Sequence, residues 1–377
     1  MRIVLVGTAY PLRGGIAHYT ALLYRHLTRK GHDVEVLSFK RQYPAFLFPG
    51  KTQIDEGVEL IPLRSVPLLD STNPVSWIRT FFWLKKSRVD LLLFKYWMPF
   101  FAPCYATVAF LARTFLNIPI LYLCDNIVPH ESNVADRTLS RIGLRFVDFF
   151  IVQSETVLRD LLLYRPDAVY RKVPHPVYEI FPPSLPKTTA RKKLGIRDQR
   201  VILYFGYIRA YKGVPCLIRA TAWVVKKRLH VKLLICGEFY EGREEALDLI
   251  DQLHLHDVVQ VHDRFIPNED VGLYFCASDL VVLPYVSATQ SGIVQVAYHY
   301  NKPVVVTRVG GLPEAVSDGK TGYVVPPENP EALGNAILSF YRDKKENAFV
   351  RNVKKEKQKY SWDRMVEAIE SFMASGH

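Results

Sequence analysis

The chain has 377 residues, of which 49% are hydrophobic, and carries a formal net charge of +12. The length exceeds that of one ordinary domain and the composition excludes a largely disordered chain, so we expect two folded domains. The charge favours an anionic partner, such as a phosphate-bearing substrate or an anionic membrane surface, although a solvated basic surface also explains it. No zinc-finger, helix-turn-helix or RNA-recognition motif is present, so we expect no nucleic-acid partner.

The cysteines indicate neither a disulfide framework nor a metal site. The five cysteines are scattered and odd in number, which favours a reducing cytoplasm. Their spacing does not fit zinc and no Asp-x-Asp motif follows a strand, so we expect no metal and no cofactor. We also expect no signal peptide, because the short apolar start ends at Gly7, as a first buried strand would.

In chain order, the first half alternates short apolar strands with helices. The pattern predicts strands at 3–6, 34–39, 90–94, 119–123 and 149–153, helices at 16–29, 77–86 and around 137–145, and an irregular segment at 41–75. Residues 96–112 lack formal charge but contain two prolines and fall short of the roughly 20 residues of a membrane span. We interpret them as a loop followed by a buried or membrane-facing helix.

A proline cluster at 174–186, followed by the basic residues 187–193, indicates a linker by its composition. The strand pattern then restarts at 201–205, 231–236, 258–261, 280–283 and 304–307, and an amphipathic helix closes the chain at 363–374. We therefore predict an α/β protein of two doubly wound, parallel-sheet (Rossmann-like) domains. Ligands of such sheets bind outside the carboxyl ends of the strands, which makes a cleft faced by both domains the expected site.

Residues 283–316 predict a strand end, a loop, a helix at 292–300, a second strand and a turn at Gly310-Gly311. Ser287 and Thr289 are hydroxyl residues in the place of a helix N-cap, and Pro313 suits the first turn of the next helix. Two helix N-termini beside neighbouring strand ends favour phosphate binding, although α/β proteins also contain such turns without a ligand.

The segment GYIRAYKG, residues 206–213, places Arg209 and Lys212 directly after a strand. Cations near a helix N-terminus oppose its dipole, so we interpret the pair as a pyrophosphate-binding site rather than as solvated side chains. Gly14-Gly15 at another helix start would let the backbone approach a ligand, a signal that is weak by itself. The G-x-G-x-x-G fingerprint is absent, which argues against a nicotinamide dehydrogenase.

Four polar residues, Asp125, Asn126, His130 and Glu131, follow the strand at 119–123. Such a cluster orients a sugar hydroxyl or takes its proton. A lone histidine is usually structural, but the strand-end position and the polar neighbours favour a functional role for His130.

A mixture of aromatic and basic residues at 77–88 suits a membrane interface. A helix that faces the core and has a solvated basic flank explains the pattern equally well. The residues are Trp77, Phe81, Phe82 and Trp83 beside Arg79, Lys85, Lys86 and Arg88.

The chain resembles the retaining glycosyltransferases of family 4, the glycosyl transferase group 1 type with the GT-B fold. The likeness spans nearly the whole chain and is strongest at 201–328, in GYIRAYKG, LLICGE, FIPNEDVGLYFCASDLVVLPY, SGIVQVAYHYNKPVVVTRVGGLPE and DGKTGYVVPP. It implies an acceptor-side domain at 1–182, a nucleotide-sugar-binding domain at 183–355 and a helical segment at 356–377 that crosses back to the first domain.

With the strand-end positions, the resemblance implies a retaining transfer in which Arg209, Lys212 and the helix N-termini help the nucleoside diphosphate to leave. From its position, we expect His130 to act on the acceptor side or on the transferred sugar. Asp125, Asn126, His130 and Glu131 form the expected acceptor side. The expected donor-site residues are Gly14, Gly15, Arg209, Lys212, Gly237, Glu238, Phe265, Ile266, Thr289, Gln290, Ser291, Gly292 and Gln295. The expected acceptor is a glycan or a lipid-linked molecule, in cell-surface polysaccharide or glycolipid synthesis on the inner face of the plasma membrane.

One departure from the family concerns its pair of glutamates, which hold the sugar and the ribose. The aligned positions here are Ala288 and Val296, and the nearest polar groups are Thr289, Gln290 and Gln295. Glutamine donates and accepts hydrogen bonds but carries no charge. Two alternatives therefore stay open: a non-catalytic nucleotide-sugar-binding subunit, and a sugar-nucleotide epimerase of similar fold.

Overall fold

The computed structural model describes residues 1–44, 52–55, 57–128, 134–197 and 200–374. The chain divides into two compact units, Met1–Pro176 with Ser361–His377, and Val177–Tyr360. The resemblance implied a first boundary after residue 182. Residues 177–182 group with the second unit, in which Tyr178 lies against Gly292 and the Tyr300 hydroxyl donates to the Pro182 carbonyl at 2.8 Å.

The first unit contains one seven-stranded sheet in which every neighbouring pair is parallel, as predicted. The strand order is β3-β2-β1-β4-β5-β6-β7. The prediction of an irregular segment at 41–75 is wrong in part, since it contains β3. The strands are β1 (Arg2–Val6), β2 (Asp33–Arg41), β3 (Ser65–Asp70), β4 (Leu91–Tyr96), β5 (Ile120–Cys124), β6 (Phe149–Val152) and β7 (Val169–Lys172).

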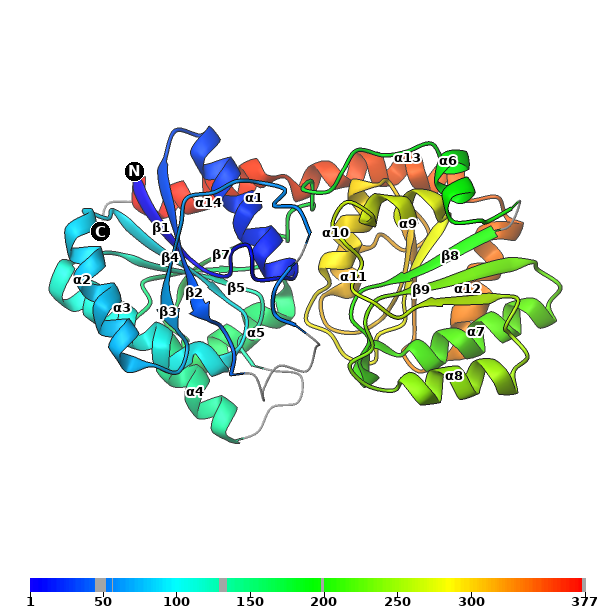
Figure 1. The fold of residues 1–377 in the computed structure, drawn as a ribbon, viewed down its shortest axis with the longest axis horizontal. Helices are drawn as coiled ribbons and strands as arrows, with labels where there is room; N and C mark the ends of the chain where they lie inside the picture. The colour runs from blue at the N-terminus through cyan, green and yellow to red at the C-terminus, as the bar shows by residue number, and fades with distance from the viewer. Residues whose placement is uncertain (45–51, 56, 129–133, 198–199, 375–377) are drawn as a thin grey trace. The chain divides into compact units, whose positions relative to one another are not determined.

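Helices cover both faces of this sheet (Figure 1). On one face, α1 (Gly15–Arg29) contacts the closing helix α14 (Trp362–Ala374). The other face carries a layer of helices that contact one another in chain order, as right-handed crossovers require. This layer consists of α2 (Pro74–Ser87), α3 (Ala102–Leu116) with the short η2 (Pro99–Phe101) before it, α4 (Val134–Leu144) and α5 (Glu155–Tyr164).

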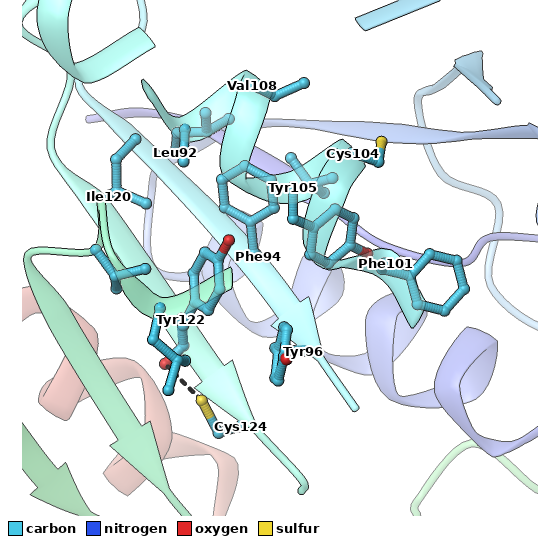
Figure 2. Close-up of a cluster of buried hydrophobic side chains, with 14 of the residues drawn as sticks. Leu92, Phe94, Tyr96, Phe101, Cys104, Tyr105, Val108, Ile120, Tyr122 and Cys124 are labelled. Atoms are coloured by element: carbon cyan, nitrogen blue, oxygen red, sulfur yellow. Dashed lines mark hydrogen bonds between the residues drawn. The ribbon is translucent and has the colours of Figure 1, made fainter. Parts of the chain in front are cut away.

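The core of the first unit lies between α3 and the central strands (Figure 2). Tyr105 of α3 packs against Phe94 of β4, with ring centroids 4.9 Å apart, and Phe94 packs against Tyr122 of β5 at 5.1 Å. Burial raises the pKa of Tyr105 and of Tyr122 well above the ordinary value. Within the described residues one helical stretch, Pro99–Leu116, is long and apolar enough to cross a membrane, but half of it is buried in this core.

The second unit contains a six-stranded parallel sheet of order β10-β9-β8-β11-β12-β13. The chain enters in the middle at β8, runs outward to β10 and returns to β11 on the other side of β8. Crevices at such a reversal are the usual ligand sites of open α/β sheets. The strands are β8 (Arg200–Phe205), β9 (Val231–Cys236), β10 (Val259–His262), β11 (Leu280–Leu283), β12 (Val304–Thr307) and β13 (Gly322–Val325).

The prediction of a linker at 187–193 is wrong, because these residues form a helix of the second unit that packs on α9. The buried Asp279 holds it, accepting from Lys187 Nζ at 2.6 Å and from the Arg191 guanidinium at 2.8 Å. The helices of this unit are α6 (Lys187–Lys193), α7 (Val214–Lys226), α8 (Arg243–Gln252), α9 (Val271–Ala277), α10 (Gly292–His299), α11 (Leu312–Ala315), α12 (Pro330–Arg342) and α13 (Glu346–Glu356), with η3 (Ala210–Lys212) and η4 (Lys357–Tyr360).

Candidate functional site

The loops that follow β8 and β11 meet at the reversal point of the second sheet. The Val286 N–H donates to the Tyr211 carbonyl at 2.8 Å. Gly213 has φ +67, and a Cβ there would lie 2.0 Å from the Pro284 carbonyl oxygen. Only glycine combines this backbone conformation with so close an approach, so Gly213 fixes the two loops against each other.

Lys212 lies at this junction, over the aromatic rings of both loops. Its Nζ is 3.7 Å from the centroid of Tyr285 and 5.0 Å from that of Tyr211. Burial lowers the pKa of Lys212; Tyr211 opposes that shift, and the positive charge of Arg209 adds to it. Within the part of the chain that the structure describes, no carboxylate forms an ion pair with Lys212, so its charge is available to an anionic ligand.

Arg209 lies at the same sheet edge, and aromatic rings hold its guanidinium. The guanidinium carbon is 5.2 Å from the Tyr240 ring, which stacks on Tyr207 with centroids 4.8 Å apart. Tyr240 follows β9, and this loop is tied to the β8 loop because the Ile208 N–H donates to the Glu238 carbonyl at 3.0 Å. The structure therefore brings Gly237 and the buried Glu238 beside the segment that carries Arg209.

The loops before α10 and α11 also adjoin each other. The Gly311 N–H donates to the Thr289 carbonyl at 2.8 Å, and a Cβ at Gly310, which has φ +47, would lie 1.5 Å from the Ala288 carbonyl oxygen. The prediction of Ser287 or Thr289 as N-cap is wrong. The N-cap is Ser291, whose hydroxyl accepts from the Ile293 N–H at 3.3 Å.

The remaining donor-side residues lie at different distances from this junction along the sheet. Phe265 and the buried Ile266 follow β10, whose end is tied to the β9 loop because the Gly237 N–H donates to the His262 carbonyl at 3.1 Å. Gln295 is buried inside α10, and its Oε1 has no hydrogen-bond partner among the described residues. Gly14 and Gly15 belong to the first unit, at the start of α1.

On the predicted acceptor side, Asp125 is half of a buried ion pair. Its carboxylate accepts from Lys95 Nζ at 2.5 Å, and Lys95 is only 1% exposed. The ammonium also lies 3.6 Å from the centroid of the Tyr19 ring. Burial lowers the pKa of Lys95, while the negative charge of Asp125 opposes that shift. In the structure, the Asp125 carboxylate is therefore the counter-ion of the buried Lys95.

The neighbours of this ion pair come from α1, from α14 and from the segments that follow β6 and β7. The Gln153 amide donates to the Tyr19 hydroxyl at 2.8 Å, and the His175 and Trp362 rings each lie 5.0 Å from the Tyr19 ring. Asn126 donates to the Trp97 carbonyl at 3.2 Å. His130 and Glu131 lie outside the described residues. Among those that are described, no group of three His, Cys, Asp or Glu side chains could hold a metal ion.

Two family models match the chain, and together they span most of it. Residues 14–174 match the glycosyl transferase 4-like domain, and residues 199–343 match the glycosyl transferases group 1. The chain belongs to the group 1 glycosyltransferases. The resemblance drawn from the motifs is thereby confirmed.

Relatives of this glycosyltransferase extend over nearly its full length. The D-inositol 3-phosphate glycosyltransferase of Saccharomonospora viridis is 27% identical over 94% of this chain and 88% of its own. Among solved structures, sucrose-phosphate synthase from Thermosynechococcus elongatus has a TM-score of 0.76 at 20% identity, and Anabaena HepE in complex with UDP-glucose has 0.72 at 17%. Both cover 100% of each chain. These neighbours confirm the GT-B fold class.

The structure adds residues that the sequence of this glycosyltransferase did not single out. Lys95 lies inside the apolar run LLLFKY, and its partner is 30 residues away along the chain. Tyr211 and Tyr285 lie in the segments that follow two predicted strands, but neither was given a role of its own. A basic residue at the end of a buried strand was the one available signal for Lys95, since lysine is almost never buried without a partner.

The pH dependence of stability tests the burial of His175 in the first unit. Burial, followed by the positive charge of Lys95, lowers the pKa of His175 from 6.5 to about 4. Above pH 6.5 the His175 imidazole is neutral in both the folded and the unfolded state. As the pH falls from 6.5 to 4, only the unfolded state takes up a proton, so this histidine costs up to about 3 kcal/mol of stability.

Urea denaturation followed by tryptophan fluorescence measures this effect, because four of the five tryptophans lie in the first unit. His175→Gln cannot titrate, so its stability should fall less than that of the parent between pH 6.5 and 4. Parallel loss of stability in both proteins would show that His175 does not stay neutral in the folded state.

Proposed function

We propose that this glycosyltransferase moves a sugar from a nucleotide-sugar donor to a glycan or lipid-linked acceptor with retention of anomeric configuration. Its setting would be the synthesis of cell-surface polysaccharide or glycolipid. The complex of HepE with UDP-glucose supports the donor class. The relative named for D-inositol 3-phosphate supports a hydroxylated acceptor and adds that molecule to the candidates for a test.

The observation that carries the proposal is the pair of cations at the reversal point of the second sheet. Arg209 and Lys212 repel each other electrostatically, and each lies over an aromatic ring. Among the described residues, no carboxylate forms an ion pair with either of them. Mutual repulsion and burial make such a pair unfavourable without an anion. A nucleoside diphosphate supplies that anion with the geometry of two adjacent phosphates.

The chemistry follows from the charge that develops as the donor reacts. The bond between the anomeric carbon and the diphosphate oxygen breaks, and negative charge grows on the leaving phosphate. Lys212 and Arg209 stabilise that charge without a metal ion, and the low local dielectric strengthens their effect. The acceptor hydroxyl oxygen bonds to the anomeric carbon on the face that the diphosphate leaves, and its proton passes to the departing phosphate oxygen, with no protein nucleophile assigned.

A second candidate function is nucleotide-sugar binding without catalysis. The positions aligned with the family's glutamates are Ala288 and Val296, whose side chains are 6% and 4% exposed. They pack in the apolar interior and offer no group to a sugar. Measured turnover of a bound donor separates a catalytic from a non-catalytic protein.

Adding a carboxylate to the loop before α10 should weaken donor binding. Gln290→Glu would place a negative charge near the proposed diphosphate position, at a cost of about 1 kcal/mol, roughly fivefold in affinity. The loss should be largest for a donor whose sugar is itself acidic. Calorimetric titration of nucleotide sugars measures it, and Gln290→Ala, which adds no charge, is the control. Equal or tighter binding by Gln290→Glu would show that the loop does not face the diphosphate.

A thermal-shift panel of nucleotide sugars tests the proposed donor class as a whole. A ligand present at 100 times its dissociation constant adds about 2.7 kcal/mol to stability. At least one nucleotide sugar should raise the melting temperature of the parent protein. If no nucleotide sugar and no nucleoside diphosphate does so, the proposed function is wrong.

A further inference from the structure

The helices α2, α3 and α4, which cover one face of the first sheet (Figure 1), carry large apolar side chains that are exposed to solvent. Phe82 on α2 is 56% exposed and Phe115 on α3 is 62% exposed. Contiguous exposed apolar surface of this kind marks an interaction site, whereas isolated apolar residues do not. We call the outer surface formed by Val75, Ile78, Phe82, Phe110, Phe115 and Ile142 the aromatic face; all six side chains are exposed.

Ring contacts make the aromatic face continuous across the helices. Centroids lie 5.3 Å apart for Phe82 and Phe81, 6.1 Å for Phe81 and Phe115, and 6.1 Å for Phe115 and Phe110. Phe110 then contacts Phe146, just beyond α4, at 5.0 Å. Aromatic contacts thus run from α2 across α3 to the end of α4.

The structure corrects the composition of the interface expected at 77–88. Trp77 and Trp83 pack against the core of the first unit, and the Trp77 indole donates to the Asp70 carbonyl at 2.8 Å. Phe82 points away from that core. The interface therefore includes α3, whose outer residues Phe110 and Phe115 had no place in the expectation from the sequence.

The charges around the aromatic face have one predominant sign. Residues 74–116 contain six lysines and arginines and a single acidic residue, Asp90, and five of the six remain once the buried Lys95, which pairs with Asp125, is set aside. Lys85 and Lys86 are exposed in the last turn of α2, and α4 adds exposed Arg137 and Arg141 along with Asp136. One arginine of this region is neutralised, since Arg113 pairs with Asp148 at 2.8 Å.

We propose that the aromatic face docks on an anionic lipid bilayer. The phenylalanines enter the interfacial region, and the basic side chains contact lipid phosphates. Lysine is depleted in protein–protein interfaces, so the lysine-bearing rim favours a lipid surface over a protein partner. This inference rests on the proposed function, because that function explains why the protein would dock. Docking would hold the acceptor-side unit on the membrane face where a lipid-linked acceptor is presented.

Flotation of the full chain with lipid vesicles tests the inference. The parent should bind vesicles that contain phosphatidylglycerol, fail to bind pure phosphatidylcholine vesicles, and lose binding as salt rises. Phe82→Ser/Phe115→Ser and Lys85→Gln/Lys86→Gln should each weaken binding at least about tenfold, since one basic residue near an anionic surface contributes about fivefold.

Matched controls separate the aromatic face from exposed apolar surface and positive charge in general. Leu163→Ser removes an apolar side chain of α5 that is 78% exposed, and Lys226→Gln/Lys227→Gln removes an adjacent lysine pair at the end of α7. Both should bind within about twofold of the parent. Circular dichroism checks that each variant is folded.

Absence of parent binding to anionic vesicles would overturn the inference, and so would equal binding by parent and variants. If Phe82 and Phe115 are needed for a protein dimer and not for vesicle binding, the aromatic face contacts a protein partner, and the inference is also overturned. Vesicle binding is measured without nucleotide. A donor panel with no stabilising ligand would therefore contradict the proposed function without changing the vesicle-binding result. Likewise, failure of vesicle binding would leave the donor result unchanged.

Discussion

Replacing Lys95 by methionine should lower the free energy of unfolding of the first unit by about 3–5 kcal/mol, the usual cost of removing one partner of a buried ion pair. The Lys95 ammonium is 1% exposed and bonds to the Asp125 carboxylate at 2.5 Å. Methionine fills much of the same volume but leaves the carboxylate buried without its counter-ion. Urea denaturation followed by tryptophan fluorescence measures the loss.

The double variant Lys95→Met/Asp125→Leu is the informative control. Apolar replacement of a whole buried pair is often neutral or stabilising, so most of the lost stability should return. If the single variant loses less than about 1 kcal/mol, water reaches Asp125 in the absence of Lys95 and the pair is not buried as described. The site would then again offer a carboxylate for acid–base chemistry.

Lys212→Ala should weaken binding of a nucleoside diphosphate by about 1.5–3 kcal/mol, the net contribution of a hydrogen bond to a charged group. This corresponds to roughly 10- to 150-fold in affinity. The intact donor should lose about the same, because the interaction is with the diphosphate and not with the sugar. Calorimetric titration of UDP and of a UDP-sugar compares the two losses.

Lys227→Ala is a matched control for Lys212→Ala. Lys227 also lies over an aromatic ring, with Nζ 4.8 Å from the Trp223 centroid, but it follows the end of α7 instead of a strand. Its removal should leave UDP affinity unchanged. Unchanged affinity in Lys212→Ala as well would place the diphosphate elsewhere, and the assignment of Arg209 and Lys212 would be wrong.

The sequence predicted the fold well where burial dominates each segment. Runs such as LVVL at β11 and VVVT at β12 are buried on both sides, as parallel strands between helical layers require. The pattern failed at the sheet edge. Strand β3 contains Pro67, which cannot donate to a ladder, and most of its residues are partly or fully exposed. The proline lies inside the short apolar run at 66–69, and a proline within such a run argues against a central strand.

The sequence predicted only those features of the candidate site that depend on residues close together in the chain. The position of Arg209 and Lys212 after a strand indicated a site, whereas the rings that hold them come partly from loops that follow other strands. The N-cap of α10 shows the same limit. Ser287, Thr289 and Ser291 are all suitable by type, and the helix begins after Ser291 in a loop held by Gly310 and Gly311 of a distant turn.

Turnover of a nucleotide sugar, followed by NMR of the anomeric protons, tests the central claim most directly. The donor is the one that stabilises the protein most in the thermal-shift panel, offered with D-inositol 3-phosphate and with glycan and lipid-linked acceptors. We predict one nucleoside diphosphate released for each new glycosidic bond, with the anomeric configuration of the donor retained. A donor that binds but stays intact with every acceptor, or that is epimerised without one, would contradict the proposed function.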